Sequence, residues 1–159
     1  MPRRILFLLI AAAFAATAQN YDGPRPEKKD LPYLKHATNL VPTEAVVAKE
    51  DSKRSSGSLY TIEGANSTAA TPLAAPVFLI QVDKIPPEKL SLYKLDSKAG
   101  HREIFITPKK SVTAIRLEID KVSSDNIWKV EVSDSLEAGE YCLTVDGDSS
   151  NQAFCFRVR

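Results

Sequence analysis

Residues 139–158 read GEYCLTVDGDSSNQAFCFRV and carry the clearest pattern in the chain. Apolar residues alternate with others on both sides of a polar turn, as in two antiparallel strands that bury one face. A turn centred on residues 148–149 places Cys142 opposite Cys155. In the same register, the apolar residues of the two strands face each other. The alternation and the cysteine positions therefore agree on one hairpin.

The two cysteines of this hairpin are the only ones in the sequence. In an exported protein, cysteines that face each other on neighbouring strands form a cross-strand disulfide, so we predict a bond between Cys142 and Cys155. A metal or redox pair is the alternative. However, the sequence has no Cys-x-x-Cys motif, and tetrahedral zinc needs further ligands that are not nearby. We expect no metal and no cofactor.

The start of the chain predicts export. A basic start, MPRR, precedes an apolar run at residues 5–18 that ends in small residues. This pattern is typical of a secretory signal peptide, residues 1–18, cleaved after Ala18 and before Gln19. The run of 14 residues is shorter than the ~20 that span a bilayer, which makes a membrane anchor the weaker alternative. We expect a secreted or periplasmic protein with no membrane span in the mature chain.

Composition argues against two classes of partner. The whole chain is 43% hydrophobic and 26% charged, with a net charge of +1. Loss of the signal peptide leaves 19 basic and 20 acidic residues, a net charge of −1. A near-neutral chain has no general field for nucleic acid or for an anionic membrane.

Strand-like patterns also precede the final hairpin. Residues 77–82 form a run that is apolar on both faces, the signature of a strand buried in the middle of a sheet. Residues 115–120 and 127–132 alternate apolar and polar side chains. Each of these two segments therefore has a core face and a water face.

A second hairpin and a long loop lie in the middle of the chain. Residues 90–95 and 102–106 flank a turn in which Gly100 supplies a positive φ, which predicts a hairpin. Residues 64–76 form the longest connection and contain two prolines that prevent regular pairing. We expect this loop to lie as a strap across the domain.

The segments nearer the N-terminus are less definite. Residues 45–50 are compatible with a two-turn helix capped by Thr43 or with a short strand. Their β-branched content favours a strand in a hairpin with residues 58–63. Residues 19–42 contain four prolines and a charge run, with too few periodic apolar residues to build an element. We expect them to be an extended, mobile N-terminal segment that links the domain to a partner or surface.

Together these patterns predict seven to nine strands in one domain, residues 43–159, with no long helix. We expect an all-β, antiparallel, immunoglobulin-like β-sandwich. The turn that contains Gly139 and Tyr141 resembles the tyrosine corner of such sandwiches, in which the tyrosine hydroxyl bonds back to the backbone. In antibody domains this tyrosine lies two residues before a cysteine bonded across the sheets, whereas Cys142 follows Tyr141 directly.

The sequence also resembles uncharacterised secreted proteins of environmental bacteria. The resemblance rests on GEY at residues 139–141, FCF at residues 154–156 and the loop TPLAAP at residues 71–76. It covers most of the mature chain. It implies export and β architecture, and it brings no activity.

The sequence lacks recognised catalytic motifs. It contains no GxSxG elbow, HExxH pair, Walker A loop or GxGxxG, and its two histidines, His36 and His101, fall in the N-terminal segment and at a turn. Asp146, Asp148 and Glu140 could offer oxygens to Ca²⁺, but Asp-Gly-Asp is also ordinary turn chemistry. We therefore expect no enzyme, with a hydrolase as the least favoured function.

Aromatic rings are the remaining candidates for a binding site. Tyr60, Tyr93 and Trp128 would form a carbohydrate platform if they pointed outward, although Trp128 shares its phase with Val130 and is expected in the core. Our hypothesis is an exported, non-enzymatic β-sandwich that acts as a binding or structural interaction module for an unknown protein or glycan partner. A carbohydrate-binding accessory domain is the alternative.

Overall fold

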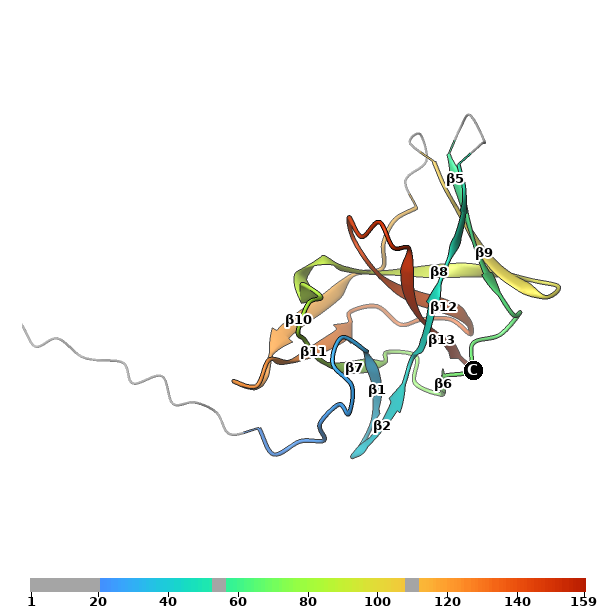
Figure 1. The fold of residues 1–159 in the computed structure, drawn as a ribbon. Coiled ribbons are helices and arrows are strands. Elements are labelled where there is room, and N and C mark those ends of the chain that lie inside the picture. The colour runs from blue at the N-terminus through green and yellow to red at the C-terminus, as the bar shows by residue number, and fades with distance from the viewer. Residues whose placement is uncertain (1–20, 53–56, 108–111) are drawn as a thin grey trace, which may run out of the picture.

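The computed structural model describes residues 21–52, 57–107 and 112–159 (Figure 1). Within these residues the chain forms thirteen strands in two sheets and one short 3₁₀ turn, η1 (Pro87–Lys89). The all-β prediction is confirmed. The predicted signal peptide and its cleavage site lie outside the described residues.

The first sheet has five strands, paired antiparallel throughout. Its order is β10 (Leu117–Lys121), β11 (Ile127–Val132), β7 (Val77–Gln81), β1 (Tyr33–His36) and β2 (Asn39–Pro42). Phe78 and Ile80 of the central strand are fully buried. The prediction of a buried central strand at residues 77–82 is therefore confirmed.

The second sheet has eight strands. Seven follow in the order β3 (Glu44–Val47), β13 (Gln152–Val158), β12 (Gly139–Val145), β8 (Leu90–Lys98), β9 (His101–Ile106), β5 (Ser58–Glu63) and β4 (Lys49–Asp51), all antiparallel. The eighth strand, β6 (Ala70–Thr71), pairs in parallel with β13. It is the one regular element in the long loop predicted as a strap.

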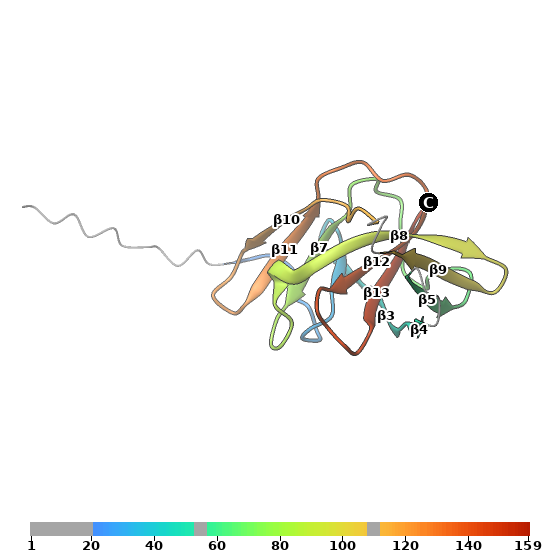
Figure 2. The same cartoon turned by 90° about the horizontal axis from the view of Figure 1, so that it is seen from above.

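The second sheet curls until its two ends nearly meet. β3 and β4 are separated in the chain only by Ala48, yet β3 pairs with β13 at one end of the sheet and β4 pairs with β5 at the other. β8 serves two neighbours, because residues 90–95 pair with β12 and residues 96–98 pair with β9. Figure 2 shows β8 as the long strand that joins the two parts. The sheet is therefore nearly barrel-shaped.

The main core lies between the five-stranded sheet and one face of β8, β12 and β13. Phe78 packs edge-on against Phe156 with ring centroids 5.1 Å apart, and Tyr141 stacks on Phe156 at 5.7 Å. Leu34 and Leu143 fill the space around these rings. Aromatic pairs of this kind stabilise a core beyond the area that they bury.

The opposite face of the same three strands points into the barrel. Side chains alternate along a strand, so Cys142 and Cys155 face away from the main core. They form a second cluster of buried residues with Ile62 and Leu95. The final hairpin thus has protein on both faces.

The sequence predictions about pairing are confirmed in full for the final hairpin and in part for two others. Cys142 lies opposite Cys155 in the β12–β13 register, and the two form a disulfide. β8 and β9 form a hairpin with Gly100 at a φ of 85°, as predicted. Its paired residues on β8 are 96–98, which were expected in the turn, whereas residues 90–95 pair with β12. Residues 45–50 contribute to strands rather than to a helix. β4 pairs with β5 as expected, whereas residues 44–47 form β3 and pair with β13 instead.

The expectation that residues 19–42 build no element is wrong for their second half, which forms β1 and β2. Tyr33 and Leu34 pair with β7 and are buried, so the partner strand supplies the packing that the local sequence lacks. The turn between these strands places Ala37 at a φ of 53°. Glycine or asparagine normally marks such a turn, and neither occupies that position. The predicted seven to nine strands are consequently too few.

Asp30 fastens this segment to the five-stranded sheet. Its backbone N–H donates to the Gln81 carbonyl at 2.8 Å. Its carboxylate accepts hydrogen bonds from the backbone N–H groups of residues 83–85 at 2.9 to 3.1 Å. Partial burial raises the pKa of this carboxyl, but the backbone donors outweigh it, so the pKa lies below its ordinary value.

Candidate ligand site at the mouth of the barrel

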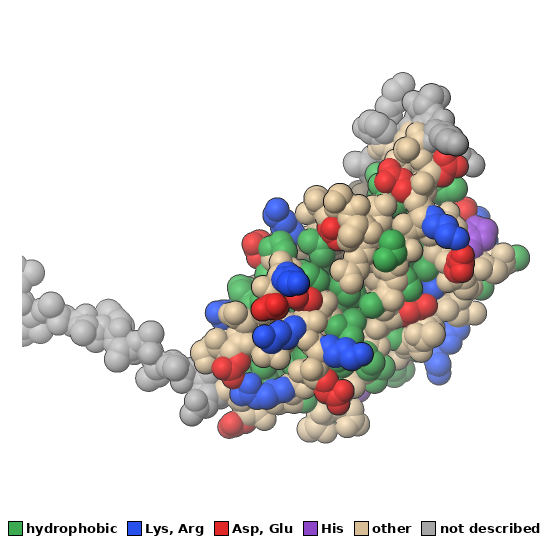
Figure 3. All heavy atoms as spheres, in the orientation of Figure 1, with side chains coloured by type: hydrophobic (Ala, Val, Ile, Leu, Met, Phe, Trp, Pro, Cys, Tyr) green, Lys and Arg blue, Asp and Glu red, His purple; other side chains and the backbone are tan. Residues whose placement is uncertain are grey.

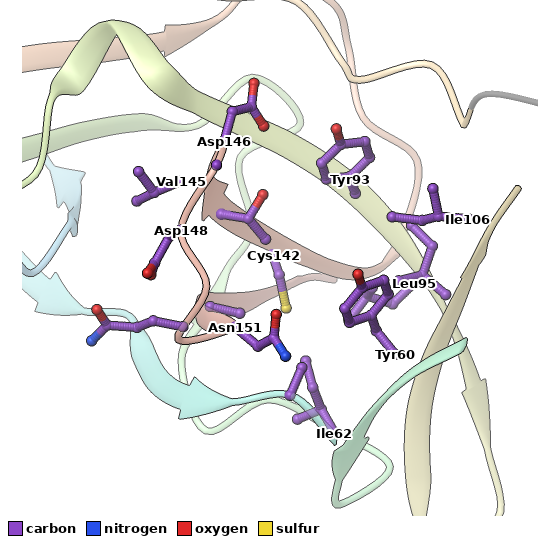
Figure 4. Close-up of a pocket in the computed structure, with 16 residues that line it drawn as sticks. Tyr60, Ile62, Tyr93, Leu95, Ile106, Cys142, Val145, Asp146, Asp148 and Asn151 are labelled. Atoms are coloured by element: carbon purple, nitrogen blue, oxygen red, sulfur yellow. The ribbon is translucent and has the colours of Figure 1, made fainter. Parts of the chain in front are cut away.

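One end of the near-barrel opens into a cavity of about 210 Å³ (Figure 4). We call it the barrel mouth. Inward side chains of β5, β8, β9, β12 and β13 form its wall, and the β12–β13 turn forms part of its rim. Residues that define it include Tyr60, Ile62, Tyr93, Leu95, Cys142 and Asn151.

The deep part of the barrel mouth is apolar. Ile62 and Leu95 are each 6% exposed, and Ile104 packs against them. The disulfide adds sulfur to this wall, and Figure 4 shows the Cys142 sulfur directed toward the enclosed space. The interior of a small barrel is built in this way, because inward side chains of neighbouring strands meet in layers.

Polar groups without charge lie nearer the opening. In the part of the chain that the structure describes, the side chains of Tyr93, Thr144 and Asn151 line the barrel mouth and make no hydrogen bond. Burial raises the pKa of the Tyr60 phenol, and the nearby Glu50 carboxylate raises it further. Tyr60 therefore stays a neutral hydroxyl at ordinary pH.

Two carboxylates lie on the β12–β13 turn, and both already have partners. Asp146 accepts a hydrogen bond from the Ser91 hydroxyl at 2.8 Å. Asp148 accepts from the hydroxyl and the backbone N–H of Ser150 at 2.5 and 2.9 Å, and these bonds lower the pKa of its carboxyl. Figure 4 shows both carboxylates turned away from the Tyr60 ring. The side of the rim that faces the cavity is accordingly neutral.

A buried charge cluster closes the other end of the barrel. Arg102 on β9 is fully buried, and all five of its N–H groups have acceptors. Its Nε donates to the Gly64 carbonyl at 2.8 Å, and its Nη2 donates to the Glu63 carbonyl at 2.9 Å. Both Nη atoms hold the Glu44 carboxylate, at 2.8 and 3.2 Å. Nη1 also donates to the Ser67 hydroxyl at 2.6 Å.

A second carboxylate, Glu140, joins the cluster through Ser67. The backbone N–H and the hydroxyl of Ser67 both donate to Glu140 Oε2, at 2.9 and 2.6 Å. This oxygen lies 3.8 Å from Arg102 Nη1, and Glu140 is 3% exposed. Because Ile62 pairs with Arg102 across the β5–β9 ladder, the charge cluster lies beside the apolar floor of the barrel mouth. The Arg102 guanidinium therefore links its own strand, β9, to β3, to β5 and to the loop that contains Gly64 and Ser67.

The three carboxylates that the sequence offered as calcium ligands do not come together in the structure. Glu140 belongs to the charge cluster, whereas Asp146 and Asp148 belong to the turn at the barrel mouth. Among the described residues, no group of three or more His, Cys, Asp or Glu side chains could hold a metal ion. The Asp-Gly-Asp sequence serves as a turn, with Gly147 at a φ of 81°.

The structure brings together two of the three predicted aromatic residues. Tyr60 and Tyr93 both line the barrel mouth, whereas Trp128 lies on the other sheet and packs against the main core. The amino group of Lys121 is 5.9 Å from the centre of the Trp128 ring. Tyr60 and Tyr93 are therefore part of one site, and Trp128 is not.

The residues of the predicted structural corner lie at the start of β12, which Gly139 opens. The Tyr141 hydroxyl donates to the Glu137 carbonyl at 2.8 Å. This is the bond to the backbone that a tyrosine corner makes. Tyr141 has its ring in the main core and no part in the barrel mouth.

Neither histidine belongs to the barrel mouth. His36 Nε2 lies 3.0 Å from the Thr71 hydroxyl, and His101 Nε2 lies 3.0 Å from the Glu103 carboxylate. None of these four residues lines the cavity.

Sequence reasoning missed the interior of the barrel. Thr144 and Ala153 lie on the face of the hairpin for which the alternation predicts no burial, but they pair across β12 and β13 and line the cavity. One signal was available, because Ala153 and both cysteines make the second face of the hairpin unusually apolar. Arg102 gave no such signal, since a charged residue beside a turn normally lies at the surface.

Comparisons with protein-family models, curated proteins and solved structures find no match to this chain. None of the helical segments in the described ranges is long and apolar enough to cross a membrane. On the face shown in Figure 3, acidic and basic side chains are interspersed rather than gathered by sign. Function is therefore inferred from the barrel mouth.

Proposed function

We propose that this protein is an exported, non-enzymatic binding protein whose ligand site is the barrel mouth. The observation that carries the proposal is a cavity with apolar depth and neutral polar groups at its opening. Small-molecule sites have this composition, because apolar walls supply affinity and a few polar groups fix orientation. The export part rests on the pattern of residues 1–18 and on the disulfide.

A binding role suits the chemistry of the lining better than catalysis does. Cys142 is held in the disulfide, and the carboxylates of Asp146 and Asp148 are turned away from the cavity and paired with serines. A general base must reach the proton that it abstracts. The groups that do face the cavity, such as Thr144 and Asn151, can donate and accept hydrogen bonds without changing charge.

The finer fold assignment is also a proposal. We propose that the packed sheets belong to the immunoglobulin-like sandwiches, with one sheet extended into the near-barrel. The bond from the Tyr141 hydroxyl to the Glu137 carbonyl supports this assignment.

Carbohydrate binding is the second candidate function. It is favoured by the position of Tyr60 and Tyr93, since sugars stack on exposed aromatic rings and both rings lie at one opening. Loss of glycan binding in Tyr60→Ala and Tyr93→Ala variants would establish it.

The proposed function is tested with the purified exported chain and a broad panel of small molecules. Ala153→Leu fills the barrel mouth from β13, whereas Ala45→Leu adds the same side chain at an exposed position on β3 and serves as the matched control. We expect at least one compound to bind the wild type and Ala45→Leu but not Ala153→Leu. A panel in which no compound distinguishes the two variants would refute the site.

A further inference from the structure

The class of ligand can be narrowed if the barrel mouth is the binding site, and the following inference rests on that proposed function. We propose that the occupant carries one uncharged, ring-sized apolar group that enters the cavity. A single neutral hydrogen-bonding group, such as a hydroxyl or an amide, remains at the opening. A phenol or a benzyl alcohol has this form.

The size of the cavity limits the group that enters. Pockets for drug-sized ligands measure about 300–1,000 Å³, which is larger than the barrel mouth at about 210 Å³. An apolar cavity of about 150 Å³ is sufficient to bind benzene. The barrel mouth therefore accommodates one ring with a small substituent and excludes fused or linked rings from its depth.

The side chains of the deep wall indicate that the ligand group entering the cavity is apolar. Ile62, Leu95, Ile104 and the disulfide offer no strong hydrogen-bond donor or acceptor. A sugar ring in this position would bury hydroxyl groups without hydrogen-bond partners, which is unfavourable. The cavity depth consequently favours an aromatic or aliphatic ring over a pyranose.

The groups at the opening indicate that the polar part of the ligand is uncharged. The Thr144 hydroxyl and the Asn151 amide line the cavity without a hydrogen bond to any described residue, and Figure 4 shows Asn151 and the Tyr60 ring bordering the same space. These groups can satisfy a hydroxyl or an amide. No basic side chain lines the cavity among the described residues to pair with an anion. The two carboxylates on the turn have serine partners and face elsewhere. The Glu50 carboxylate beside Tyr60 is not part of the cavity lining and accepts a hydrogen bond from the Ser58 hydroxyl at 2.8 Å. A cation in the cavity therefore gains no unpaired carboxylate among the described lining residues.

The experiment is a titration of the purified exported chain, followed by the amide signals of the lining residues in nuclear magnetic resonance. The probes are phenol and benzyl alcohol as neutral rings, benzoate and benzylamine as charged rings, and methyl β-glucoside as a sugar. We expect saturable shifts of the lining signals with the neutral rings and at least about tenfold weaker binding of the charged rings, because a charge must be desolvated at the opening. We expect no shift of the lining signals with the glucoside.

Two variants keep the result interpretable. Ala153→Leu should abolish the shifts, and Ala45→Leu should retain them. If Ala153→Leu fails to fold, Ala48→Leu tests the same cavity from the bend between β3 and β4, whose backbone is hydrogen-bonded to Asn151. Binding of the glucoside in preference to phenol, or of a charged ring as strongly as a neutral one, would overturn the ligand class while the site remained. Absence of binding by both neutral rings would also overturn the ligand class. The proposed site itself would be refuted only if no compound of the broad panel described above bound Ala45→Leu but not Ala153→Leu.

Discussion

Replacing Arg102 by methionine tests the role of the charge cluster in holding the barrel together. The side chain is fully buried and donates five hydrogen bonds. Its positive charge compensates the negative charges of the Glu44 and Glu140 carboxylates. Removing one partner of a buried ion pair costs about 3–5 kcal/mol, since the remaining charge is left without compensation. Domains of this kind are stable by about 5–15 kcal/mol, so Arg102→Met should remove a large fraction of the total.

Urea unfolding followed by circular dichroism measures this loss. With a slope of about 1–3 kcal/mol per molar urea, the midpoint should fall by roughly 2 M. A triple variant, Arg102→Met with Glu44→Met and Glu140→Met, leaves no buried charge and should recover at least half of the loss. Lys49→Met breaks an exposed ion pair with Glu63 and should leave the midpoint unchanged. A loss below about 1 kcal/mol in Arg102→Met, or a triple variant less stable than the single one, would refute the reasoning.

Three further predictions follow from single contacts. Replacing both Cys142 and Cys155 by alanine should lower stability by at most about 3 kcal/mol in thermal unfolding, and thiol labelling of the unreduced wild type should find no free thiol. Tyr141→Phe removes one hydrogen bond to the backbone and should cost about 0.5–1.5 kcal/mol in the same assay, with unchanged near-ultraviolet packing signals. Asp30 has a folded-state pKa below its unfolded value, so its stabilising effect is present above about pH 4 and is lost as the pH falls through the folded-state pKa. Asp30→Asn should therefore flatten the acid side of the stability profile, and an unchanged acid side would contradict the role of its three backbone donors.

The predictable part of the fold lies where two sequence signals coincide. In the final hairpin, apolar alternation and two cysteines fixed the same register, and β7 stood out as a run apolar on both faces. β1 and β2 had no comparable signal, because their burial comes from pairing with β7 and their turn uses Ala37 with a positive φ. Local patterns therefore identified strands that carry their own packing and missed strands that depend on a partner.

The candidate site was predictable only as separate residues. Tyr60 and Tyr93 were named as aromatic candidates, but nothing in the sequence placed them at one opening. That arrangement depends on the bend at Ala48, which lets consecutive strands pair at opposite ends of a curled sheet. Closure of this kind is a tertiary property. The buried position of Arg102 follows from the same closure, and a surface position would have been the ordinary expectation.

The most direct measurement asks whether the barrel mouth is an open, apolar cavity. Crystals of the exported chain equilibrated with xenon gas would show this by anomalous diffraction, because dry apolar cavities take up xenon. We predict a xenon atom in contact with Ile62, Leu95 and the Cys142 sulfur. Diffraction that places ordered water there, or side chains that fill the space, would contradict the proposed site.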